Sequence, residues 1–183
     1  MKKIYPSLKD LIKEELTDSE DKKTTQLIRK FKVVKKRGYL TKKEFVEIGM
    51  WKSPRPKKNY LRNSDKDVVE ITKKALSTKF EKSRIMLLVT LKGVSIPTAS
   101  AILTLIDPKD YGVIDIRVWQ TLYLYNVVKN KPDGVNFSFN NWYTYLSKLR
   151  YFAKMYATSV RNIERTIFLH HKKIQEGLLY KET

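Results

Sequence analysis

The sequence LKGVSIPTASAILTLIDPKDYGVID, residues Leu91 to Asp115, contains the features from which the rest of the chain is best interpreted. An apolar run ends at Leu91, Gly93 can take a positive φ angle, and Pro97 suits the first turn of a new helix. The small residues of TASA then allow the preceding helix to approach closely. The pattern predicts two helices joined by a short hairpin, with the carboxylate of Asp115 beyond them.

Outward from this hairpin, apolar residues recur at helical spacing over most of the 183 residues. Gly38 predicts the end of one helix, and Thr41 with Glu44 predicts a capping box at the start of the next. The prolines and lysines of residues 53–63 predict a loop, and only VNFSF alternates as a strand would. We therefore expect one all-α domain, 1–183, with N-terminal helices in 1–38, a helix-hairpin-helix core in 64–127 and C-terminal helices in 138–176.

The composition favours a polyanionic partner. Lys and Arg number 38 against 19 acidic residues, which gives a formal charge of +19. Nucleic acid is the first candidate, and a merely solubilising surface is the alternative. Cysteine is absent, which excludes disulfides, thiolate zinc sites and iron-sulfur clusters. No apolar run approaches the roughly twenty residues of a membrane span. We expect a monomeric, cytoplasmic, nucleoid-associated protein without membrane contact.

The hairpin is a candidate phosphate site. Amides in the turn and at the start of the following helix have no intrahelical acceptor, and they would therefore point toward a bound anion. Lys92 adds a positive charge beside them. The predicted phosphate-binding residues are Lys92, Gly93, Val94, Ser95, Ile96 and Thr98. On these residues alone, an ordinary hairpin between two helices is an equally good interpretation.

Taken together, LKGVSIPTASAIL and the later YGVIDIRVW resemble the helix-hairpin-helix DNA glycosylase superfamily. Its members carry an L-P-G-V-G-x-x-T-A hairpin and a catalytic aspartate in a V-D-x-H-V context, and the likeness extends from Leu91 to about Leu122. The resemblance implies a glycosylase-like helical fold, duplex DNA as partner and Asp115 as the catalytic residue. It also implies that the backbone carbonyls of Val89, Leu91 and Val94 hold a structural Na⁺ or K⁺.

Three residues depart from the family pattern. Ser95 replaces the second hairpin glycine, which would strain the turn if that position needs a positive φ angle. Arg117 stands where many members have histidine. Pro97 stands where members that also cleave the strand carry a lysine, and it offers no amine for a Schiff base. The resemblance therefore implies a monofunctional glycosylase.

Asp115 has a chemical role that fits this reaction. Cleavage of an N-glycosidic bond builds positive charge on the deoxyribose, which a fixed carboxylate stabilises while it orients water. Asp115 precedes an apolar-periodic helix, where helix amides favour its ionised form. A helix cap without catalytic function is the alternative. A non-catalytic helix-hairpin-helix DNA-binding protein is accordingly the second functional hypothesis, and an RNA-binding or interaction domain is a weaker third.

A glycosylase also needs a pocket for the flipped base and a side chain that fills the vacated stack. The candidates are Trp51, Arg55, Tyr60 and Trp119, although for each aromatic residue burial in the core is the competing interpretation. His170 and His171 are adjacent in a lysine-rich helix, and we expect them at the surface.

Overall fold

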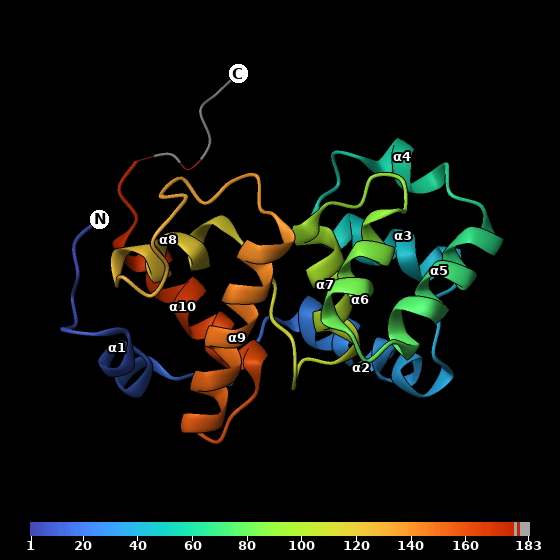
Figure 1. The fold of residues 1–183 in the computed structure, drawn as a ribbon. Coiled ribbons are helices and arrows are strands. Elements are labelled where there is room, and N and C mark those ends of the chain that lie inside the picture. The colour runs from blue at the N-terminus through green and yellow to red at the C-terminus, as the bar shows by residue number, and fades with distance from the viewer. Residues whose placement is uncertain (178, 180–183) are drawn as a thin grey trace.

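The computed structural model describes residues 1–177 and 179, and within them the fold is all-α. The helices are α1 (Leu8–Glu15), α2 (Lys22–Arg37), α3 (Lys42–Lys52), α4 (Lys57–Leu61), α5 (Asp65–Ser77), α6 (Glu81–Val89), α7 (Ile96–Ile106), α8 (Ile116–Leu124), α9 (Phe139–Met155) and α10 (Val160–Ile174). They form two groups that lie side by side, with α2 to α7 in one and α1, α8, α9 and α10 in the other (Figure 1). The all-α prediction is confirmed.

Helix α7 is the centre of the first group. It packs against α2, α3 and α6, and every one of its residues except Pro97 is buried. Small side chains such as Ala99, Ser100 and Ala101 have no exposed surface, which is why the neighbouring helices can approach closely. This burial matches the apolar composition of the segment.

The second group forms around α10, which packs against α1, α8 and α9. The expected surface position of His170 and His171 is wrong, because both side chains are fully buried. His170 Nδ1 lies 3.1 Å from Glu15 Oε1 in α1, and His171 Nε2 lies 2.9 Å from Gln120 Oε1 in α8. Contacts with α1 and α8 thus enclose the two histidines, while the neighbouring Lys172 and Lys173 remain exposed.

The tertiary structure adds detail to two segments. The two helices of residues 1–38 lie in different groups, since α1 packs on α10 whereas α2 packs on α7. The expected loop of residues 53–63 contains the short helix α4, in which Tyr60 is fully buried. Burying an aromatic ring supplies the packing that stabilises a single helical turn there.

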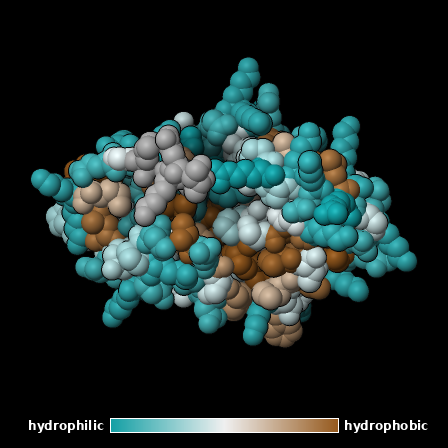
Figure 2. Space-filling view, turned by 90° about the horizontal axis from the view of Figure 1, so that it is seen from above, coloured by the Kyte–Doolittle hydropathy of each residue, from teal (hydrophilic) through white to brown (hydrophobic). Residues whose placement is uncertain are grey.

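The ends of the helices follow the sequence chemistry. Gly38 ends α2 in a left-handed conformation at φ +83°, and Thr41 with Glu44 forms the capping box of α3. Among the described residues, each helix is too short or too polar to cross a bilayer. Hydrophilic side chains project over much of the face seen in Figure 2, as the charge of +19 requires.

Candidate functional site

Asp115 occupies the junction between the two groups of helices. It is the N-cap of α8, and its Oδ1 accepts a hydrogen bond of 3.0 Å from the backbone N–H of Arg117. Its other oxygen, Oδ2, lies 3.0 Å from the ammonium of Lys52 at the end of α3. Both side chains are only 18% exposed, so solvent screens this ion pair weakly.

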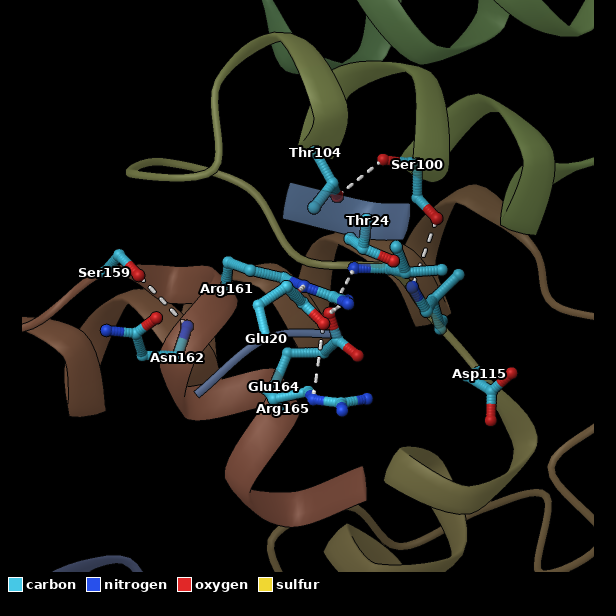
Figure 3. Close-up of polar contacts among 12 residues, drawn as sticks. Glu20, Thr24, Ser100, Thr104, Asp115, Ser159, Arg161, Asn162, Glu164 and Arg165 are labelled. Atoms are coloured by element: carbon cyan, nitrogen blue, oxygen red, sulfur yellow. Dashed lines mark hydrogen bonds and ion pairs between the residues drawn. The ribbon is translucent and has the colours of Figure 1, made fainter. Parts of the chain in front are cut away.

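The residues just before Asp115 are held from three directions. The hydroxyl of Ser100 in α7 accepts the N–H of Ile114 at 3.1 Å, and Tyr145 in α9 donates to the carbonyl of Val113 at 2.7 Å. Glu164 in α10 accepts the N–H of Val113 at 3.2 Å. Helices from both groups thus fix the backbone that presents Asp115 (Figure 3).

The environment keeps the Asp115 carboxyl ionised. Burial raises its pKa. The positive charge and hydrogen bond of Lys52, together with the N–H and charge of Arg117, lower the pKa by more than burial raises it. The net result is a pKa below the ordinary value of an aspartate. Asp115 is therefore negatively charged at neutral pH, as stabilisation of a positively charged sugar requires.

Two cavities meet at Asp115 and Lys52, which line both. The larger, about 300 Å³, is also lined by Trp51 of α3 and by Arg117, Glu164 and Phe168 of the second group. The smaller, about 230 Å³, is lined by hairpin residues that include Ser95, Pro97 and Thr98. The carboxylate consequently separates a pocket of ligand size from the hairpin.

An ion-pair network forms one wall of the larger cavity. The guanidinium of Arg161 pairs with Glu164 through one nitrogen and, at 2.7 Å, with Glu20 through another. Arg165 also reaches Glu20, at 3.4 Å. Burial raises the pKa of Glu164 above its ordinary value, and the Arg161 charge opposes this shift. Figure 3 shows this network apart from the Asp115 carboxylate, to which it makes no hydrogen bond.

The hairpin adopts the predicted geometry with one difference at Ser95. Gly93 has φ +86°, as the sequence predicts. Ser95 has φ −97° and ψ 171°, an extended conformation that any residue adopts, so a serine at this position introduces no backbone strain. The first intrahelical bond of α7 runs from Ala99 N–H to the Ser95 carbonyl, 2.8 Å, and the amides before it lack helical acceptors. Lys92 is exposed beside them.

The hairpin is anchored by side chains from the α4 region. The Asn63 amide oxygen accepts the N–H of Lys92 at 2.8 Å, while its amino group donates to the Lys92 carbonyl at 3.1 Å. The ring of Tyr60 packs beneath Gly93 and donates its hydroxyl to the Ser53 carbonyl at 3.2 Å. These contacts make the hairpin a rigid element.

The expected monovalent cation site would be formed by backbone oxygens, which are suitable ligands for Na⁺ or K⁺. One of the three carbonyls, that of Leu91, accepts the N–H of Val94 at 3.1 Å, and its second lone pair remains available. The carbonyls of Val89 and Val94 would supply the other ligands. No cluster of three or more His, Asp or Glu side chains suited to a metal occurs in the part of the chain that the structure describes.

Of the four residues expected at the base pocket or wedge, Trp51 alone is among those lining the larger cavity, and its indole N–H donates to Thr24 at 3.2 Å. Tyr60 and Trp119 are core residues, 0% and 1% exposed, and their placement at the pocket is wrong. Trp119 turns its N–H inward to the carbonyls of Asn130 and Lys131, which satisfies its donor away from the cavity. Arg55 is exposed between α3 and α4.

Sequence reasoning missed the residues that complete the site. Lys52 carries no local signal among 38 basic residues, because its pairing with Asp115 spans 63 positions. Phe168 and Glu164 likewise belong to a helix whose periodicity indicates burial but not a cavity. Only Asp115 and the hairpin were marked by neighbouring residues.

No protein family, curated protein or solved structure matches this chain in comparisons with known proteins.

Proposed function

We propose that this protein is a DNA glycosylase, which hydrolyses the N-glycosidic bond of a damaged or modified base in double-stranded DNA. The observation that carries the proposal is Asp115, an ionised carboxylate that faces a ligand-sized cavity on one side and a hairpin of the predicted geometry on the other. The formal charge of +19 supports DNA as the partner. The protein acts as a monomer on cytoplasmic or nucleoid DNA.

In this reaction the C1′–N bond breaks as the base leaves, and positive charge develops on the deoxyribose. The Asp115 carboxylate stabilises that charge, because it is already ionised and is held by Lys52 and the Arg117 amide without further reorganisation. It also orients the water that adds to C1′. The larger cavity receives the flipped base, with Trp51 at its wall.

The hairpin binds a phosphate of the same strand. The exposed Lys92 supplies charge, and the amides at the start of α7 donate hydrogen bonds. We expect Lys92→Ala to weaken duplex binding at every sequence and to reduce the salt dependence by about one phosphate contact. Duplex affinity measured at several salt concentrations checks this, and an unchanged slope would remove Lys92 from the phosphate site.

The test of catalysis is Asp115→Asn on oligonucleotides that carry a panel of modified bases. Asparagine keeps an oxygen for the Arg117 N–H and so retains the cap, but it removes the charge. We expect base release to fall by at least about 10²–10³-fold, with duplex affinity nearly unchanged. Asp110→Asn, at an exposed carboxylate outside both cavities, is the control and keeps full activity.

If wild type and Asp115→Asn behave alike on every substrate, the alternative of a non-catalytic helix-hairpin-helix DNA-binding protein replaces the enzyme. The hairpin itself favours base removal without strand cleavage, because Pro97 offers no amine.

A second candidate activity, base removal followed by strand cleavage, is favoured by the position of Lys52. Its amine lies 3.0 Å from Asp115 and lines the same small cavity as Pro97. After giving its proton to the departing base, the amine would add to C1′ and pass a proton to O4′ as the sugar opens to an iminium. Loss of a C2′ proton to water would then eliminate the 3′ phosphate. Borohydride trapping on preformed abasic DNA distinguishes the two: a covalent complex lost in Lys52→Met supports cleavage, and no complex supports base removal alone.

A further inference from the structure

The guanidinium of Arg117 is the one cation lining the larger cavity for which the described residues provide no carboxylate or hydrogen-bond partner. Lys52 pairs with Asp115, Arg161 with Glu20 and Glu164, and Arg165 with Glu20. The Nε atom of Arg117 is buried and without an acceptor. A desolvated charged donor is unfavourable unless a ligand satisfies it.

The acidic side chains of the cavity are already engaged. Asp21 accepts hydrogen bonds from the amide and hydroxyl of Thr24, at 2.9 and 2.7 Å. Asp115 is bound by Lys52, and Glu164 by Arg161 and the Val113 amide. These carboxylates thus have hydrogen-bond donors within the protein, whereas the Arg117 guanidinium still has donors without an acceptor.

An aromatic ring restrains the orientation of the Arg117 guanidinium. The guanidinium carbon of Arg117 lies 5.4 Å from the centroid of the Phe168 ring, and that of Arg165 lies 5.9 Å away. Contact with a ring face restrains a guanidinium without using its hydrogen-bond donors. Arg117 thus keeps its donors available two residues from Asp115.

We infer that the cavity selects a neutral base with a carbonyl oxygen conjugated to the glycosidic nitrogen, whose departure as an anion Arg117 stabilises. This inference rests on the proposed glycosylase function and names its substrate class. As the C1′–N bond breaks, the electron pair moves onto the base and is shared by its carbonyl oxygen, to which the guanidinium donates. Uracil, hypoxanthine and 8-oxoguanine belong to this class.

The same charge disfavours the other large class of damaged bases. A purine alkylated at N3 or N7 carries a positive charge in DNA and leaves as a neutral molecule. It would be repelled by Arg117 on entry and would gain nothing from it as the bond breaks. The arrangement of charges therefore favours release of oxo bases over release of cationic bases.

The test measures base release by chromatography, under single-turnover conditions, from duplexes that carry uracil, hypoxanthine, 8-oxoguanine or 7-methylguanine. We expect release of at least one oxo base, and release of 7-methylguanine at least about 100-fold more slowly. Arg117→Met should slow release of the oxo base by about 10²–10³-fold, and Arg117→Lys, which restores a charge, should recover part of the rate.

The control is Arg165→Met, which removes a guanidinium from the same ring but one that is paired with Glu20. Equal losses in both Met variants, without recovery in Arg117→Lys, would show a packing role and overturn the inference. Release of 7-methylguanine as fast as any oxo base would overturn it while the glycosylase function stands. Release of no base from any duplex would overturn both.

Discussion

Substituting alanine at Gly93 tests whether the hairpin is the rigid element that its contacts indicate. Gly93 has φ +86°, in the left-handed region. A Cβ at this position would lie 3.0 Å from Cβ of Asn59 and 3.0 Å from Cδ1 of the fully buried Tyr60. The Tyr60 ring also lies against Gly49 and edge-on to Phe45, so it has little room to move.

Two penalties add at this position. A left-handed conformation costs a residue other than glycine about 1–2 kcal/mol, and crowding a packed aromatic ring costs about 1–3 kcal/mol. Gly93→Ala should therefore lower the free energy of unfolding by about 2–5 kcal/mol. For a chain of this length, that corresponds to a fall in Tm of about 6–15 °C.

Gly38→Ala is the matched control. Gly38 has nearly the same angle, φ +83°, but a Cβ there would meet no atom within 4 Å. Only the backbone penalty applies, so we expect a loss of about 1–2 kcal/mol and a fall in Tm of about 3–6 °C. The difference between the two variants isolates the contact of the hairpin with Tyr60 and Asn59.

Urea denaturation followed by circular dichroism, with Tm from thermal melts, measures both variants. Equal losses in Gly93→Ala and Gly38→Ala would refute the close packing of Tyr60 beneath the hairpin. A change below about 0.5 kcal/mol at both positions would refute the backbone argument as well.

Three further predictions concern charge. Lys52→Met removes the charge that lowers the pKa of Asp115, so the rate of base release should begin to fall at a higher pH as the solution is acidified. Rates measured from pH 4 to 8 check this, and an unchanged acidic side of the pH profile would contradict it. Burial and the nearby positive charge of Arg117 lower the pKa of His171 to about 4. The unfolded chain therefore binds the proton first, and stability should fall by up to about 3 kcal/mol as the pH drops from about 6.5 to 4. His171→Gln should flatten this slope in urea titrations, and an equal slope would refute the assignment. Arg161→Met leaves the buried Glu164 without its guanidinium and should cost about 3–5 kcal/mol in the same assay, so a loss under about 1 kcal/mol would show that the pair contributes little.

The part of the site that could be predicted from the sequence lies within one short segment. Gly93 and Pro97 define the hairpin because their backbone preferences are properties of single residues. Asp115 before an apolar-periodic helix predicts an N-cap, which the structure confirms. Ser95 was the uncertain residue of this segment, and its extended backbone removes the expected strain.

Elsewhere, periodicity predicted the helices but not their partners. It gave the helical character of residues 160–174 correctly, yet placed the adjacent histidines at the surface. Which faces of a helix are covered depends on the helices that pack against it, and here α1 and α8 cover two faces of α10. Tyr60 and Trp119 show the same limit, since an aromatic side chain suits a core and a binding pocket equally well.

By itself, then, the sequence determined the all-α class, the hairpin and the capping position of Asp115, because each depends on residues that are close together in the chain. Only the tertiary structure decided what surrounds that carboxylate. Lys52 reaches it from α3, and Arg117 shares its cavity with Phe168 of α10. These contacts depend on how the two helix groups pack together, and no pattern within a short stretch of sequence predicts that packing.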